Sequence, residues 1–278
     1  MEQFKYPKKI DWDKETYRST YGKVVVEPLE RGFAITVGNC LRRILLSAIP
    51  GVAITSVKID GVAHEFSTIP GVKEDVTDFV LNLKQVNLKA NISEFPRKFS
   101  VTIGKKTELL AGDLFPGSEV SVENPKLHIA TLSEETTLKL ELTVNQGFGY
   151  VPAGRIVEEG VPINTIPLAA SFSPITRVSY RIENTRVGQR VDYERLLLEI
   201  WTTGAITPKD AVKHAAGILN KHFNLIAETE TEETKKPKEL PAAAVGLAEE
   251  LLSNKPLSGK KQKKKKLKKN ATSAKKKG

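Results

Sequence analysis

The sequence predicts an α+β fold that consists mainly of antiparallel β-sheet. Apolar and polar residues alternate in short segments that are rich in branched side chains and separated by Gly, Pro, Asp or Asn. Few segments have helical spacing, so few helices are available to connect parallel strands, which favours antiparallel pairing. The expected strands are residues 24–26, 54–59, 99–103, 119–122, 127–132, 138–144, 178–182 and 196–201.

The first of the expected helices spans residues 38–49. Apolar residues recur there at i, i+3, i+4 and i+7, which places them on one helix face. Arg42 and Arg43 project away from that face, and Pro50 with Gly51 should end the helix. The apolar face consists of Leu41, Ile44, Leu45 and Ala48.

A second helix is expected over residues 74–84, with the same spacing of apolar residues. Glu74 and Asp75 fall in its first turn, where the helix dipole favours negative charge. Its apolar face consists of Val76, Phe79, Val80 and Leu83.

The longest expected helix covers residues 208–226. Thr207 is a suitable N-cap, Pro208 suits the first helical position and Asp210 the third. Its apolar stripe is broad, which indicates that the helix contacts a helix of a partner. The alternative is that the stripe packs on the sheet of its own chain. The periodicity of apolar residues does not decide between these two interpretations. The stripe consists of Ala211, Val212, Ala215, Ile218, Leu219, His222, Phe223 and Ile226.

The net charge of +10 comes from the C-terminal end of the chain. Residues 255–278 contain 12 lysines and no acidic residue, so residues 1–254 carry a net charge of −2. The basic composition therefore describes a tail and not a binding face on a folded domain. We expect residues 229–278 to form a linker and a disordered tail. The lysines at 263–266 are candidates for non-specific contact with phosphates, which would depend on salt concentration. A tail that binds no partner fits the sequence equally well. The candidate lysines are Lys263, Lys264, Lys265 and Lys266.

No catalytic or metal-binding pattern is found. Cys40 is the only cysteine, which excludes an intramolecular disulfide and a cysteine zinc cluster. The four histidines, which include no i, i+4 pair, are not spaced for a shared metal, and neighbouring acidic residues do not converge. Residues 147–149 are expected to form a tight loop and not a nucleotide-binding turn. No apolar run is suitable for a signal peptide or a membrane span, so we expect an intracellular protein with a binding or scaffold role.

Ordered motifs extend this interpretation along residues 4–228. They include EPLERGF at 27–33, TVGNCLRRILLSAIPG at 36–51, GVKED at 71–75 and LNLK at 81–84, and continue with GYVPA at 149–153. This succession resembles the bacterial RNA polymerase alpha-subunit family. In particular, the helix at 38–49 and the helix at 208–226 are similar to the helices with which that family dimerises.

The resemblance implies a two-subdomain fold and a homodimer. A discontinuous dimerisation subdomain, residues 1–50 and 173–228, would hold an antiparallel sheet and two helices, and residues 51–172 would form an inserted sheet-rich subdomain. The two apolar faces would pack against the same surface of a second copy. This hypothesis expects Leu45 and Leu219 to be left uncovered in a single copy. The implied dimer interface is Leu41, Ile44, Leu45, Ala48, Val212, Ala215, Leu219 and Phe223.

The resemblance also implies partners. One copy would contact the beta subunit, through Arg43 with Arg42, and the other would contact beta-prime, through Lys84; omega and sigma would join the holoenzyme. Because catalysis in that family belongs to beta-prime, the chain would be a non-catalytic subunit of a nucleotidyltransferase and would hold no cofactor.

One departure from the family concerns DNA. Nothing after Glu228 resembles the family's C-terminal DNA-binding domain, so DNA contact would be indirect or non-specific through the tail. The alternative functions are a nucleic-acid-binding protein that acts through this tail, and an enzyme whose site is assembled from distant loops. The cytoplasm is the expected location, with a plastid as the alternative.

Overall fold

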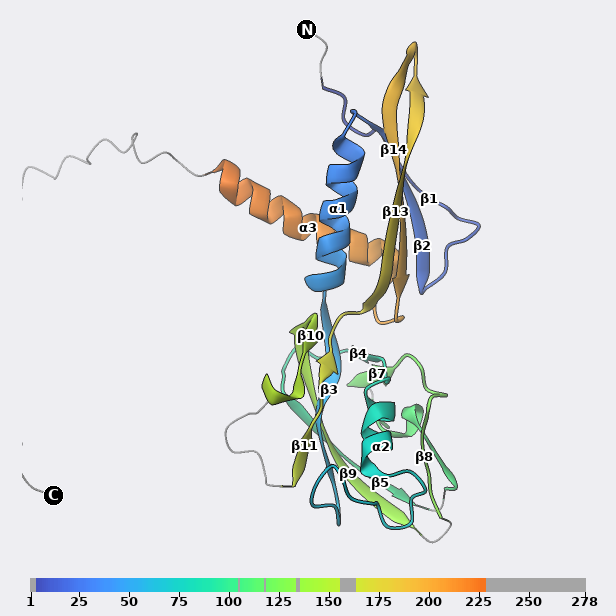
Figure 1. Cartoon of the computed structure of the whole chain (residues 1–278), viewed down its shortest axis with the longest axis vertical. Coiled ribbons are helices and arrows are strands. Elements are labelled where there is room, and N and C mark those ends of the chain that lie inside the picture. Colours follow the sequence, from blue (N-terminus) through green and yellow to red (C-terminus); the bar gives the residue numbers. More distant parts are fainter. Residues whose placement is uncertain (1–3, 105, 118, 134–135, 156–163, 229–278) are drawn as a thin grey trace, which may run out of the picture. The chain divides into compact units, whose positions relative to one another are not determined.

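The computed structural model describes residues 4–104, 106–117, 119–133, 136–155 and 164–228 (Figure 1). Within these residues the sheets are antiparallel and three α-helices accompany them, which confirms the predicted α+β class. The helices are α1 (Phe33–Ser47), α2 (Val76–Leu83) and α3 (Pro208–Ala227), with short 3₁₀ turns η1 (Ala111–Asp113) and η2 (Ala153–Arg155). The strands are β1 (Lys9–Trp12), β2 (Tyr21–Leu29), β3 (Pro50–Ile59), β4 (Leu88–Ala90), β5 (Arg97–Gly104), β6 (Glu108–Leu110), β7 (Val120–Val122), β8 (His128–Thr131), β9 (Thr137–Phe148), β10 (Tyr150–Val151), β11 (Thr165–Pro167), β12 (Ala170–Ser171), β13 (Ile175–Val187) and β14 (Arg190–Thr202).

One sheet has four strands in the order β1-β2-β14-β13. Its strands come from both ends of the described chain, because β14 pairs with β2 on one side and with β13 on the other. Helix α1 packs against β13 and β14, and α3 packs against α1. The apolar core between them includes Leu45, Leu198 and Ala215, which have no exposed surface. The first and last parts of the described chain therefore fold as one unit.

The larger sheet has the strand order β5-β9-β3-β4-β7, with β11 also paired to β3. Buried and less buried residues alternate along the first part of β9, as expected for a strand with one face on a core. That core is a separate cluster of residues between positions 54 and 168, to which α2 contributes Phe79. Because its members come from one continuous stretch, this core is complete without the termini.

Helix α1 begins five residues earlier than position 38, where the sequence pattern predicts it. Gly32 precedes the helix with φ of 86° and offers no side chain to cap it. The cap comes from β14 instead, since the Glu194 carboxylate accepts hydrogen bonds from Gly32 N (2.9 Å) and Ala34 N (3.1 Å). The unpaired N–H groups at a helix start need such acceptors, and negative charge is favourable there. A capping residue 160 positions away leaves no local signal.

Helix α2 is shorter than predicted at both ends. Asp75 is its N-cap, with a side chain that accepts a hydrogen bond from Asp78 N at 2.7 Å. The prediction that Glu74 belongs to the first turn is wrong. Glu74 lies before the helix and accepts hydrogen bonds from the Thr131 N–H (2.7 Å) and hydroxyl (3.0 Å) on β8.

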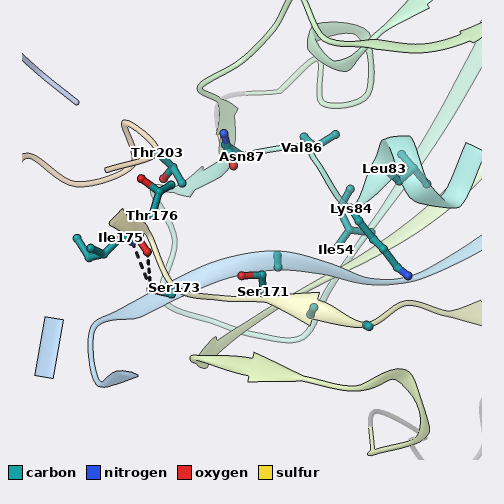
Figure 2. Close-up of a pocket in the computed structure, with 13 residues that line it drawn as sticks. Ile54, Leu83, Lys84, Val86, Asn87, Ser171, Ser173, Ile175, Thr176 and Thr203 are labelled. Atoms are coloured by element: carbon teal, nitrogen blue, oxygen red, sulfur yellow. Dashed lines mark hydrogen bonds between the residues drawn. The ribbon is translucent and has the colours of Figure 1, made fainter. Parts of the chain in front are cut away.

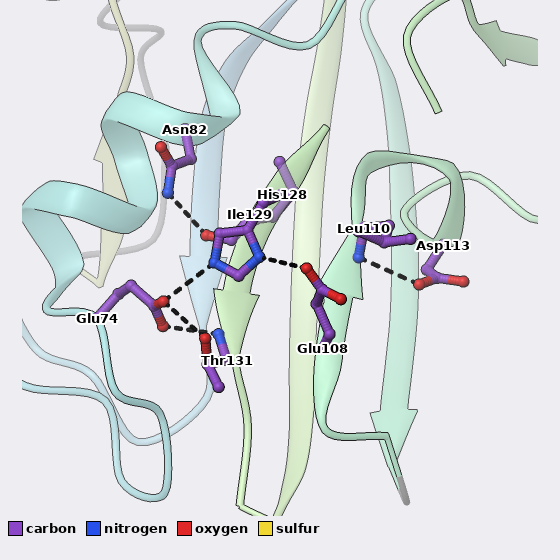
Figure 3. A network of polar contacts seen from close by, with 8 residues as sticks. All are labelled: Glu74, Asn82, Glu108, Leu110, Asp113, His128, Ile129 and Thr131. Atoms are coloured by element: carbon purple, nitrogen blue, oxygen red, sulfur yellow. Dashed lines mark hydrogen bonds and ion pairs between the residues drawn. The ribbon is translucent and has the colours of Figure 1, made fainter. Parts of the chain in front are cut away.

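His128 on β8 lies between Glu74, which precedes α2, and Glu108 on β6 (Figure 3). Its Nε2 lies 3.1 Å from Glu74 Oε1 and its Nδ1 lies 2.9 Å from Glu108 Oε1. These two carboxylates, Glu74 first and Glu108 second, raise the pKa of His128 above its ordinary value. Burial would raise the pKa of Glu74, but the hydrogen bonds from Thr131 and His128 outweigh it and lower that pKa. Both ring nitrogens are therefore occupied by separate carboxylates.

Helix α3 agrees with the sequence prediction to within one residue. Thr207 is its N-cap and accepts a hydrogen bond from Asp210 N at 3.2 Å, and Pro208 occupies the first turn. Each of the eight expected strands overlaps a strand of the structure. The strands β1, β4, β6, β10, β11 and β12 are not predicted. They have two to four residues each, and β7 and β8, which are as short, are predicted only because the alternating pattern continues beyond their ends.

Candidate functional site

The apolar stripe of α3 passes from the core into solvent. Ala211 and Ala215 are fully buried, and Leu219 is half-buried. Farther along the same face Phe223 is 58% exposed and Ile226 is 69% exposed. Figure 1 shows the same division, since α3 crosses α1 and its C-terminal half continues beyond it. The second half of the helix thus presents apolar side chains that the described part of the chain does not cover.

The expected interface residues of α1 lie differently. Leu41 and Leu45 belong to the core that α1 forms with the four-stranded sheet, and Leu45 has no exposed surface. The expectation that a single copy leaves Leu45 uncovered is therefore wrong, while Leu219 is partly covered. Helical periodicity identifies an apolar face but does not say which surface meets it. Ile44 and Val212 are partly buried and pack against the same core, and Ala48 is partly buried as well.

An aromatic cluster lies at the start of α1 and is not predicted from the sequence. The Phe4 ring lies 5.3 Å from that of Tyr6 and 4.8 Å from that of Phe33, in edge-to-face arrangements. All three side chains remain exposed, as does Ile35 in the first turn of α1. Phe4 and Tyr6 lie in an N-terminal segment outside any expected element, and only its aromatic content could have marked it.

Arg42 and Arg43 are exposed on α1, as predicted. Neither guanidinium has an ion pair or hydrogen bond with any residue in the described ranges. Residues 39–59 contain no Asp or Glu, so the local sequence supplies no counter-ion. The guanidinium groups are available for a carboxylate from outside, a geometry that Arg can bind with two parallel hydrogen bonds.

Lys84 follows α2 directly and lines a cleft of about 380 Å³ (Figure 2). The residues that line the cleft come from β3, from the end of α2 and the segment after it, from residues 169–176 and from Thr203 after β14. Lys84 is the one charged residue among them. In Figure 2 its amino group extends past Ile54, away from the labelled threonines. The remaining polar lining consists of Asn87, Ser171, Ser173, Thr176 and Thr203.

The described residues contain no group of three or more His, Cys, Asp or Glu side chains that could hold a metal ion. None of the helices in these ranges is long and apolar enough to cross a membrane. Lys263–Lys266, the candidate phosphate contacts, lie outside the described residues. Among the described residues, the candidate sites are the exposed end of α3, the arginines of α1 and the cleft at Lys84.

Comparison with known proteins identifies a family model and close relatives of this chain. Residues 57–173 match the family model of the RNA polymerase Rpb3/RpoA insert domain. The chain is 54% identical over 207 residues to the DNA-directed RNA polymerase subunit alpha of Symbiobacterium thermophilum, which covers 74% of this chain and 65% of that protein. Identity to the subunit alpha of Chloroherpeton thalassium is 46% over 240 residues, or 85% and 73% of the two chains. Identity to the subunit alpha of Alkaliphilus oremlandii is 49% over 207 residues, which is 74% of this chain and 65% of that protein. The chain therefore spans less than two thirds of the length of the Symbiobacterium and Alkaliphilus proteins.

Proposed function

The chain belongs to the family of DNA-directed RNA polymerase alpha subunits, and from this premise we propose that it acts in transcription as a homodimeric assembly subunit. It would hold the beta and beta-prime subunits together, with omega and sigma completing the holoenzyme, and would itself carry out no chemistry. The nucleotidyltransferase activity would belong to the assembled polymerase in the bacterial cytoplasm.

The observation that carries the dimer is the apolar stripe of α3. Covering Phe223 and Ile226 would remove apolar surface from water, which is favourable by about 25 cal/mol per Å². A second copy is the occupant that we propose, because a two-fold axis brings the same helix of both copies to one contact. Since Leu41, Leu45 and Ala215 are already buried in one copy, the proposed contact moves to the end of α3 and to the half-buried Leu219.

The proposed division into subdomains follows the two apolar cores. Residues 1–50 and 173–228 would form the dimerisation subdomain, which contains the core around Leu45 and Leu198. Residues 51–172 would form the insert, whose core contains Phe79, and this segment overlaps the matched insert-domain model at 57–173.

The proposed docking sites for the large subunits lie one in each subdomain. Arg43, with Arg42 beside it, would bind a carboxylate of the beta subunit on one copy. Lys84 would bind beta-prime on the other copy, at the mouth of its cleft. A role in nucleic-acid binding through the tail is not favoured, since residues 1–254 have a net charge of −2.

Light scattering on the purified full chain tests the dimer. The double variant Phe223→Ser with Ile226→Ser changes only exposed side chains, so it should fold. We expect the wild type to have the mass of two chains at micromolar concentration and the variant to have the mass of one. Ile10→Ser, at an exposed position on β1, is the matched control and should remain dimeric. A wild-type chain that stays monomeric at this concentration would exclude the proposal.

A further inference from the structure

Two exposed aromatic side chains border the turn between β9 and β10. Phe148 is 61% exposed and Tyr150 is 68% exposed, and Gly149 between them has φ of 60°. The expected tight loop at residues 147–149 is thus limited to Gly149, because Gly147 and Phe148 lie in β9. A single exposed aromatic residue is ordinary on a protein surface, but two that flank one turn form an apolar projection.

The turn is held in place by hydrogen bonds and strand pairing. Phe172 N donates a hydrogen bond to Gly149 O at 2.7 Å. Tyr150 pairs with Ser171 in the β10–β12 ladder, and Phe148 pairs with Pro50 in the β3–β9 ladder. Since the backbone on both sides is fixed, a partner that binds these rings would have little backbone entropy to overcome.

Two glycines create the support beneath the turn. Gly51 and Gly147 lie opposite each other in the β3–β9 ladder. A Cβ at Gly51 would come within 1.8 Å of Phe172 O, and one at Gly147 would come within 2.8 Å of the Phe172 ring. Only glycine therefore lets residue 172 pack this closely, and Phe172 in turn supplies the N–H that holds Gly149. The position of the aromatic turn is therefore fixed by the close packing of Phe172 on β3 and β9.

The turn lies at the C-terminal end of α1. A Cβ on Gly149 would be 3.8 Å from Ser47 O, the last residue of the helix. The Ser47 hydroxyl donates to Arg43 O at 2.7 Å, and residues four apart share a helix face. Leu46 is also exposed in this last turn. The aromatic turn therefore lies against the last turn of α1, and Arg43 lies one helical turn before Ser47 on α1.

The two chain segments that meet at this turn contain basic residues and no acidic ones. Residues 39–59 and 142–157 contain no Asp or Glu, whereas Arg42, Arg43 and Arg155 are all present. Each of the three guanidiniums is exposed, and none has a carboxylate partner among the residues that the structure describes. Such a surface is complementary to a segment that combines negative charge with apolar side chains.

We propose that Phe148 and Tyr150 form, with Arg43 and Leu46, a docking surface for a protein segment that carries a carboxylate beside apolar side chains. Arg43 binds the carboxylate, while the two rings and Leu46 bury the apolar side chains. Aromatic residues and arginine dominate the energetics of protein interfaces, and here both occur on a fixed turn and a helix end. The inference rests on the proposed function, since the segment is assigned to the large subunit that Arg43 holds.

Binding of the full chain to the purified beta subunit of the same organism tests the assignment. The double variant Phe148→Ser with Tyr150→Ser should lose about 10- to 100-fold in affinity, the range expected for truncated anchor residues. The double variant Phe148→Tyr with Tyr150→Phe keeps both rings and should bind as the wild type does. Val191→Ser, at an exposed position on β14, is the control for surface change and should also bind normally.

Arg43→Ala separates this inference from the function on which it rests. If Arg43→Ala weakens binding but the serine double variant binds beta at wild-type affinity, the aromatic turn is not part of the surface and the inference is wrong. If both variants bind as tightly as the wild type, the proposed contact between Arg43 and beta fails as well. Loss of affinity in both variants, with dimer mass and thermal midpoint unchanged, supports the surface as assigned.

Discussion

The two sheets of this protein differ in which parts of the chain supply their apolar cores. The larger sheet and α2 enclose a core drawn from one continuous stretch, residues 54–168. The four-stranded sheet with α1 and α3 draws its core from both ends of the described chain and still leaves Phe4, Phe33, Phe223 and Ile226 exposed. The core of the first part comes from one stretch of chain, and for the second part we propose that another copy covers the exposed end of α3. Stability should therefore depend on protein concentration in one case and not in the other.

The largest effect is expected from breaking the core of the larger sheet. Phe79 has no exposed surface, so Phe79→Ala should lower the free energy of unfolding by about 3–5 kcal/mol through lost burial and a cavity. Urea denaturation measures this loss, which should be the same at low and high protein concentration. Phe223→Ala is the matched change at an exposed position. It should remove the concentration dependence and cost little in dilute solution, and a large loss in dilute solution would show that the protomer itself covers Phe223.

A smaller effect is expected at the cap of α1. Glu194→Ala removes the acceptor for Gly32 N and Ala34 N, which should cost about 1–2 kcal/mol, as for other capping residues. Glu194→Gln keeps an oxygen acceptor without the charge and should lose less. The midpoint of urea denaturation at one fixed protein concentration reports both. An unchanged midpoint for Glu194→Ala would mean that α1 does not depend on β14 for its start.

The smallest effect is expected from His128. Because its pKa is raised in the folded state, its stabilisation is complete below about pH 6.5, the unfolded value, and is lost as pH rises through the folded pKa. The imidazole side chain is 42% exposed, so screening by solvent limits the effect to about 0.2–1 kcal/mol.

His128→Gln should thus be less stable than the wild type at pH 6, and the difference should shrink by pH 9. Thermal midpoints of both proteins at these two values measure it. The carboxyl of Glu74, whose pKa is lowered, loses its own stabilisation only at more acidic pH and does not disturb this comparison. A difference that grows toward pH 9 would contradict the assignment.

Local patterns predict this structure well where the cause is local. The start of α3 follows from Thr207 and Pro208, which act within one helical turn. The start of α1 could not be predicted, because Glu194 caps it from a distant strand. The exposed arginines follow from periodicity, yet Leu45 proves to face its own sheet and not a partner. Periodicity separates apolar from polar faces, whereas the surface that meets an apolar face is decided by tertiary contacts.

The placement of β14 between β2 and β13 has a consequence for synthesis on the ribosome. The nascent chain delivers β2 and α1 first, but the strand that pairs with β2 and caps α1 ends at Thr202. At about 5–20 residues per second, roughly 10–30 s separate the emergence of these partners. During that interval the intervening stretch can already fold on its own. The N-terminal elements β2 and α1, although they are synthesised first, are therefore among the last to reach their native structure.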